Sequence, residues 1–170
     1  MKETPAQYTK RILGIIGKSN PMATQRATSA KLARLVRGLS RAQLAKRPAP
    51  GKWSIAEILA HLAEAEMVIG YRIRMMLSAS GGPIQAFDQD KWADVGRYSR
   101  RDAKEALTVF AGLRQWNLGL LKSLSPAMWK RYGMHSERGK ESVAHTARMI
   151  AGHDLNHLGQ IARIRKSFKK

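Results

Sequence analysis

The chain has 170 residues, 44% of them hydrophobic, which suits a single domain with a buried core and excludes a disordered tail. It contains no cysteine, so disulfides and thiolate metal ligands are excluded, and any metal must be held by nitrogen and oxygen atoms. No stretch approaches the roughly 20 apolar residues of a membrane-spanning helix, and residues 1–9 lack the apolar run of a signal peptide. We therefore expect a cytoplasmic protein without a membrane span.

The formal net charge of +19 is distributed unevenly along the chain. Residues 1–50 hold eleven Lys or Arg and one acidic residue, whereas residues 51–99 hold five basic and six acidic residues. Such an excess favours acidic partners in general, namely nucleic acid, an anionic membrane surface or anionic small molecules. A solvated basic surface without a partner explains the charge equally well.

Helical periodicity dominates the sequence, and strand signals are almost absent. Residues 5–17 predict a short first helix, which Asn20 and Pro21 end. A basic amphipathic helix is expected over residues 22–38. Residues 47–51 form a connector, because two prolines within three residues cannot continue a helix.

The next helix has a clear start. Ser54 is a good N-cap residue, and Glu57 three positions later completes a capping box. Apolar residues then recur at helical spacing as far as Leu77. Residues 78–98 have the composition of a loop, and a loop of this length is more often functional than merely connecting.

Two more helices complete the pattern. Ser99 and Asp102 mark the start of one, and residues 142–168 form the other, with irregular chain over 127–140 between them. The expected buried side of the first consists of Ala106, Val109, Phe110, Leu113, Trp116, Leu120 and Leu121. The sum is an all-α, up-and-down bundle of about four main helices with short N-terminal helical pieces. Bundles of this kind place ligand and metal sites between facing helices.

The histidines are the most informative residues. His153 and His157 lie four positions apart in the last helix, so both imidazoles can face one ion. His61, close to the apolar side of its own helix, is the best candidate for a third ligand. Without a shared ion, one partly buried histidine bonded to a neighbour and one on the surface would explain the pair. We expect His135 and His145 to be surface or capping residues.

Three short motifs in this order resemble the DinB family of four-helix-bundle proteins. They are residues 53–62 (WSIAEILAHL), 87–92 (FDQDKW) and 153–161 (HDLNHLGQI). The resemblance covers residues 28–168, which leaves 1–27 as a basic N-terminal extension. It implies that His61, His153 and His157 bind a divalent metal, commonly zinc or nickel, with water at the remaining positions. Related proteins include S-transferases that use low-molecular-weight thiols, and many are described as metal-dependent hydrolases.

Roles for other polar residues near the motifs are less specific. Gln160, one turn after His157, could bind a ligand or support a metal ligand, and a packing role is an equal alternative. Glu64 is the nearest candidate general base, although a solvated glutamate explains it as well. Asp154 faces away from both histidines, which favours a salt bridge or the orientation of a neighbouring helix. Asp88 and Asp90 could cap a short helix or reach the mouth of the site.

Two functions therefore compete. The first is a metal-dependent S-transferase or hydrolase acting on a small molecule, with open metal positions for water or a thiol cofactor. The alternative is a basic binding module for nucleic acid or another anionic partner, with a structural metal or none. The basic ends lack the aromatic residues of a single-strand reader and show no helix-turn-helix pattern. A homodimer is compatible with such a bundle, although the sequence identifies no interface.

Overall fold

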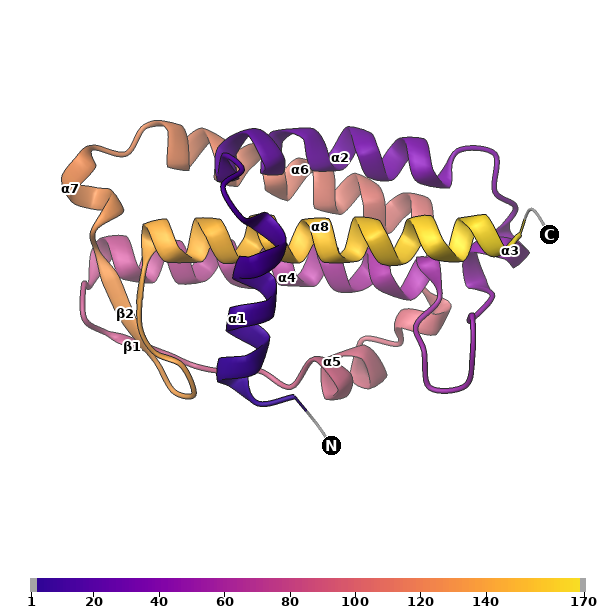
Figure 1. Cartoon of the computed structure of the whole chain (residues 1–170), viewed down its shortest axis with the longest axis horizontal. Coiled ribbons are helices and arrows are strands. Elements are labelled where there is room, and N and C mark those ends of the chain that lie inside the picture. The colour runs from indigo at the N-terminus through magenta and orange to yellow at the C-terminus, as the bar shows by residue number, and fades with distance from the viewer. Residues whose placement is uncertain (1–2, 169–170) are drawn as a thin grey trace.

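Four long helices form a bundle in the computed structural model, which describes residues 3–168. They are α2 (Pro21–Val36), α4 (Ile55–Ser78), α6 (Ala103–Lys122) and α8 (Val143–Ser167) (Figure 1). Helix α4 packs on α6 and α8, and α2 packs on α8 and α6. The expected all-α four-helix bundle is confirmed. Within residues 3–168, no helix combines the length and the apolar composition needed to cross a membrane.

Neighbouring helices α4 and α6 run in the same direction (Figure 1). Two pairs of contacts advance together along both helices: Glu66 bonds Arg114, and one turn later Gly70 faces Asn117. A plain up-and-down order would make these two helices antiparallel. They run in parallel because residues 79–102 carry the chain back along the whole bundle before α6 begins.

This returning segment is structured rather than a plain loop. It contains β1 (Pro83–Ile84), α5 (Gln89–Val95) and a 3-10 turn over Tyr98–Arg100. Between α6 and α8 the chain forms α7 (Pro126–Trp129) and the strands β2 (Tyr132–His135) and β3 (Gly139–Ser142). Strand β2 pairs in parallel with β1 and antiparallel with β3. Strands of two to four residues are too short for the alternation that identifies a strand in sequence, which is why these were not predicted.

The helix starts follow the capping chemistry of the sequence. Ser54 Oγ accepts from the Glu57 backbone, and Glu57 Oε2 accepts from the Ser54 N–H at 2.8 Å, so the predicted capping box is confirmed. The segment between α2 and α4 contains a short α3 (Arg41–Ala45), ahead of the predicted connector, with its own capping box. Helix α6 begins one residue after Asp102, whose carboxylate accepts from two backbone N–H groups.

Helix α1 (Pro5–Ile16) crosses the outside of α8 (Figure 1). The two backbones approach closely at Gly152, where a Cβ atom would lie 2.3 Å from the carbonyl oxygen of Ile12. Ile12 and Ile16 are fully buried by this contact. The expected boundary between residues 27 and 28 falls inside α2, which begins at Pro21.

The buried side of α6 differs from the expectation. Phe110 and Leu121 are buried as predicted, but Val109 is 47% exposed and Trp116 is 73% exposed, so their assignment to the core was wrong. The remaining buried positions of the helix include the polar residues Arg114 and Asn117. An apolar pattern cannot identify a helix face that is partly made of buried polar groups.

Candidate metal centre

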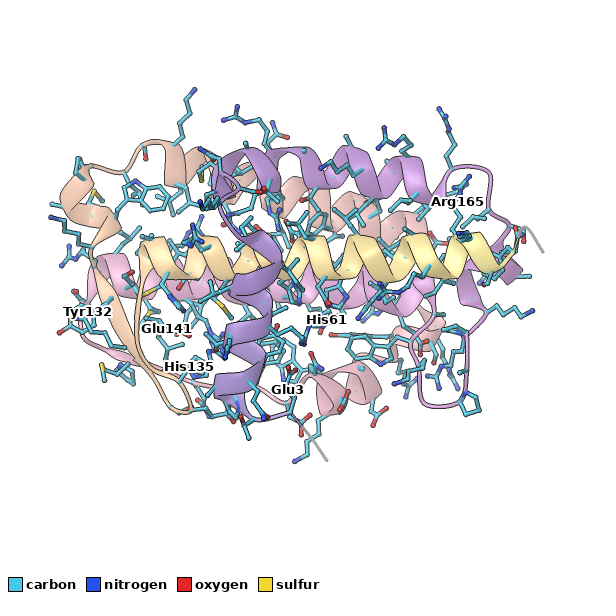
Figure 2. The ribbon with its side chains drawn as sticks, viewed as in Figure 1. Glu3, His61, Tyr132, His135, Glu141 and Arg165 are labelled. Atoms are coloured by element: carbon cyan, nitrogen blue, oxygen red, sulfur yellow. The ribbon has the colours of Figure 1, made fainter. Side chains whose placement is uncertain are left out.

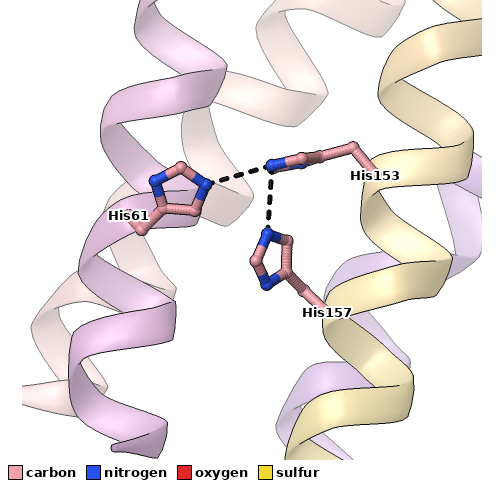
Figure 3. A group of neighbouring side chains, drawn as sticks. All are labelled: His61, His153 and His157. Carbon is pink, nitrogen blue, oxygen red and sulfur yellow. Dashed lines mark hydrogen bonds between the residues drawn. The ribbon is translucent and has the colours of Figure 1, made fainter. Parts of the chain in front are cut away.

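Three histidines from two helices meet inside the bundle (Figure 3). His61 lies on α4, and His153 and His157 lie one turn apart on α8. The Nε2 atom of His153 is 3.0 Å from Nε2 of His61 and 3.1 Å from Nε2 of His157. All three side chains are buried. The sequence-predicted group is thus assembled in space, with its three potential ligand atoms within 4.8 Å of one another.

Burial keeps the three imidazoles neutral at pH 7. It lowers the pKa of His61 to about 3 and the pKa of His157 to about 4. The pKa of His153 is also well below its ordinary value, because of burial first and the neighbouring imidazoles second. A neutral imidazole has one nitrogen lone pair free to bind a cation. The site therefore offers three uncharged nitrogen ligands.

Without a cation, the three imidazoles cannot satisfy all of their ring nitrogen atoms by hydrogen bonds. Nδ1–H of His157 donates to Oε1 of Gln160 at 2.8 Å, which makes Nε2 of His157 a lone-pair acceptor. A single proton on Nε2 of His153 can be donated along only one of these directions, to His157 or to His61, so the other short contact is left without a hydrogen bond of its own. The Nδ1 atom of His153 is buried without a hydrogen-bond partner in the described part of the chain.

A divalent ion fits this donor set. Nitrogen ligands about 2.0–2.1 Å from a tetrahedral ion are themselves about 3.3 Å apart, close to the two Nε2 separations observed. Three neutral ligands leave coordination positions open. Gln160 fixes the tautomer of His157, as second partners of metal-bound histidines commonly do.

Two clefts lead to this group, and His153 borders both of them. The first, here called the basic cleft, has a volume of about 660 Å³ and is bordered by Arg11, Lys52, Trp53, His153, His157 and Arg163. The second, here called the mixed cleft, has a volume of about 430 Å³ and is bordered by His61, Ile69, Arg72, Phe87, Arg138 and His153. Tyr8 of α1 and Asp90 of α5 border both. In Figure 2, His61 lies in the space between α1, α8 and α5.

The carboxylates proposed from sequence lie at different places. Asp88 caps α5, since its carboxylate accepts hydrogen bonds from the backbone N–H groups of Asp90 and Lys91. Capping of a short helix was one of the two roles expected for it. Asp90 borders both clefts and so lies at the mouth of the site. Glu64 borders neither cleft, and its Oε2 accepts from Tyr98 Oη at 2.6 Å. Among the carboxylates considered from the sequence, Asp90 is the one with access to the histidines.

Asp154 forms the predicted salt bridge and joins four helices. Its carboxylate binds Arg114 Nη1 at 2.5 Å and accepts from Thr28 Oγ1 at 2.8 Å. Arg114 also donates to Glu66 at 2.7 Å, and Asn117 donates to the same carboxylate at 2.9 Å. All five side chains are buried. Asp154 directly follows His153, so this polar cluster orients the part of α8 that carries the histidines.

The two remaining histidines are not part of the centre. His135 was expected at the surface or in a capping position. It is only 3% exposed, so the surface position was wrong, whereas its Nδ1 accepts a hydrogen bond from the backbone N–H of Glu137 at 3.2 Å. It lies on the buried face of β2, where Gly133 and His135 alternate with the more exposed Tyr132 and Met134. His145, on the first turn of α8, is partly exposed and lies 3.9 Å from Glu141.

Comparison with known proteins identifies the family. The sequence profile of the DinB superfamily matches residues 24–161, most of the chain. The chain belongs to the DinB superfamily. Among curated relatives, a protein of Oceanobacillus iheyensis is 26% identical over 116 residues, 68% of this chain and 67% of that protein. A protein of Geobacillus kaustophilus is 25% identical over 146 residues, 85% of this chain and 82% of that protein. Both are provisionally named metal-dependent hydrolases.

A solved structure shows the same fold. YfiT of Bacillus subtilis superposes with a TM-score of 0.82 at 18% identity, covering 99% of this chain and 91% of YfiT. It is described, again provisionally, as a metal-dependent hydrolase with an unusual four-helix bundle topology. The parallel direction of α4 and α6 is the feature of the present chain that departs from a plain up-and-down bundle.

Proposed function

We propose that this DinB-superfamily protein is a divalent-metal-dependent enzyme whose ion is held by His61, His153 and His157. The observation that carries the proposal is the convergence of three buried, neutral Nε2 atoms, two of whose contacts are 3.0 and 3.1 Å. Nitrogen ligands favour Zn²⁺ or Ni²⁺ over Mg²⁺ or Ca²⁺. The names of the relatives support the same class.

The residues around the centre have separable tasks. A divalent ion with three neutral ligands supplies Lewis acidity, because it keeps its full charge and has open positions for water, a thiol or substrate oxygen. Gln160 holds the proton of His157 on Nδ1, so Nε2 remains available as a ligand. Asp90 borders both clefts and is our candidate for the group that accepts a proton at the site. Trp53 lies against His61, with ring centroids 4.9 Å apart, and shields it from solvent.

Hydrolysis of a small molecule is the reaction class that the relatives' names favour. Transfer of a low-molecular-weight thiol to an electrophile is the second candidate, since ion binding activates a thiol as it activates water. The chain has no cysteine, so this thiol would have to come from solution. Metal-loaded protein can be assayed with nitrophenyl esters for hydrolysis and with cysteine plus chlorodinitrobenzene for thiol transfer, and His157→Ala should abolish whichever activity is found.

Metal content is the decisive measurement. Untagged protein, incubated with Zn²⁺ or Ni²⁺ and then desalted, should retain about one ion per chain by elemental mass spectrometry. His157→Ala should lose it, whereas His145→Ala, a histidine of the same helix outside the centre, should keep it. A wild-type protein that retains no ion, or a His157→Ala variant that keeps a full equivalent, would refute the proposal.

The competing proposal is a non-enzymatic basic module that binds nucleic acid or another anionic partner. Its support is the net charge of +19, with exposed cations such as Arg26, Lys31 and Arg34 on α2. Affinity for DNA that falls steeply with salt and shows no sequence preference would reduce it to general electrostatics. A cytoplasmic location and a homodimer also remain proposals, which cell fractionation and analytical ultracentrifugation can test.

A further inference from the structure

The floor of the basic cleft is a polar stripe on α8. Asn156, Gln160, Arg163 and Ser167 follow one another at spacings of four, three and four residues, so they share one face of the helix. All four border the cleft, as do the adjacent histidines. A ligand in this cleft therefore contacts polar groups of α8 on one side while its end reaches His153 and His157.

The charged groups around this stripe are mainly cationic. Arg11 from α1, Lys52 from the connector before α4 and Arg163 from α8 border the cleft, against one carboxylate, that of Asp90. Arg163 forms no salt bridge with any carboxylate of residues 3–168. A cleft with this excess of cations concentrates anions near the centre.

Arg11 is held in place over the cleft. Glu3 binds its Nε and Nη2 atoms at 2.8 and 2.9 Å, while Nη1 donates to Oδ1 of Asn156 at 3.2 Å. The side chain is close enough to the centre for its charge to contribute to the lowered pKa of His153 and His157. Arg11 thus presents a fixed guanidinium beside the polar stripe, and part of its charge is offset by Glu3.

We propose that the basic cleft binds a small organic anion, whose carboxylate or phosphate group is received by Arg163 and Arg11. The proposal rests on the proposed function, because it places the reacting end of the same molecule at the three histidines. The planar guanidinium of Arg163 can pair with either kind of oxyanion through two parallel hydrogen bonds. Arg11, whose Nε and Nη2 atoms bind Glu3, can offer the remaining N–H groups of Nη1 and Nη2. A volume of about 660 Å³ suits a small molecule and not a macromolecule.

The spacing on α8 limits the length of this ligand. Arg163 follows His157 by six residues, which is about 9 Å along the helix axis. The Arg163 side chain points toward the N-terminus of α8, with its guanidinium close to Gly159. Along the helix axis, the acidic group and the reacting group are therefore separated by about 9 Å or less. A short-chain organic acid or phosphate has this reach.

Titration calorimetry on metal-free protein tests the anion site independently of the metal. The probes are succinate and inorganic phosphate, measured separately to distinguish the two kinds of oxyanion, with neutral succinamide as the matched ligand control. Arg163→Gln and Arg11→Gln should each weaken binding about tenfold, as expected for one charge-assisted hydrogen-bonded pair. Lys166→Gln removes the same charge from an exposed position of α8 outside the cleft and should leave affinity within about twofold.

Each outcome decides the proposal. Saturable binding of either oxyanion, sensitive to Arg163 and Arg11 but not to Lys166, supports it. Equal weakening by Lys166→Gln, equal binding of succinamide, or no saturable binding of either probe overturns it. The metal content of Arg163→Gln should remain at the wild-type value, which shows that the anion site and the metal site are separate. A wild-type protein that binds metal but neither anion would defeat only this inference. A wild-type protein that binds an anion but no metal would defeat only the proposed enzyme.

Discussion

Oε1 of Gln160, one turn after His157 on the same helix, accepts a hydrogen bond from the Nδ1–H group of His157 at 2.8 Å. This hydrogen bond fixes the imidazole so that Nε2 faces His153. Gln160 is thereby a positioning residue for the candidate ligand.

Removal of that acceptor should weaken the metal site without unfolding the bundle. We expect Gln160→Leu to lower zinc affinity about 10- to 100-fold, the usual effect of losing such a partner. Gln160→Glu keeps an acceptor oxygen and should retain most of the affinity. Competition with a chromophoric chelator measures both variants, and equal affinities for Gln160→Leu and wild type would show that the hydrogen bond has no influence on the centre.

Acidification should destabilise the metal-free protein through its buried histidines. The pKa of His157 is about 4 in the folded chain, against about 6.5 in the unfolded chain, so the unfolded chain binds more protons between these values. The free energy of unfolding is therefore unaffected above pH 6.5 and falls by up to about 1.4 kcal/mol per pH unit below it. Urea unfolding at pH 7 and pH 5 should show a smaller loss for His157→Gln than for wild type. A wild-type stability that is equal at both pH values would contradict the neutral, buried state of the histidine.

The contact between Gly152 and Ile12 should be sensitive to a single methyl group. Gly152→Ala places a Cβ atom 2.3 Å from a backbone oxygen, so α1 must shift away from α8. We expect a loss of about 1–3 kcal/mol in the free energy of unfolding, and faster tryptic cleavage at Lys10 and Arg11. Gly119→Ala in α6 is the control, because a Cβ there meets nothing within 4 Å and should stabilise the helix slightly. Unchanged cleavage in Gly152→Ala would mean that α1 does not depend on this contact.

The buried Arg114 should be among the most important polar residues for stability. Arg114→Met leaves Glu66 and Asp154 buried without their cation, and loss of one partner of a buried ion pair costs about 3–5 kcal/mol. Lys91→Met removes an exposed partner of Asp88 and should cost less than about 1 kcal/mol. Urea denaturation compares the two variants, and similar losses in both would show that the cluster contributes no more than a surface ion pair.

Chelation should separate an open metal site from a structural one. Dialysis against EDTA should remove the ion while the far-ultraviolet circular dichroism stays close to that of the loaded protein, because the core of the bundle is apolar. The midpoint of thermal unfolding should fall modestly. Complete unfolding on chelation would indicate a metal with a structural role.

Local and periodic signals explain what could be predicted from the sequence. The capping box at Ser54 and Glu57 and the four-residue spacing of His153 and His157 depend on one helix each, and both appear as expected. The convergence of His61 with that pair depends on how two helices pack, and it was expected from the resemblance together with the apolar stripe.

Features that depend on tertiary contacts were not predictable in the same way. The burial of Arg114 needs carboxylates from α4 and α8, which lie 48 and 40 residues away in sequence. The exposure of Trp116 has the same origin, because α6 directs the polar side chains of Arg114 and Asn117 toward the interior and leaves Trp116 on the outside. The access of Asp90 to the histidines depends on the path of residues 79–102, which no periodicity describes.

The path of residues 79–102 has a consequence for which positions can change in sequence without loss of the fold. The segment that joins two parallel helices must travel the length of the molecule, and it carries Asp90 and Phe87 past the histidines on its way. It contributes few residues to the main apolar core. Substitutions at the exposed positions of this segment can alter which molecules reach the centre while the four helices keep their packing, so access to the centre and folding stability depend largely on different residues.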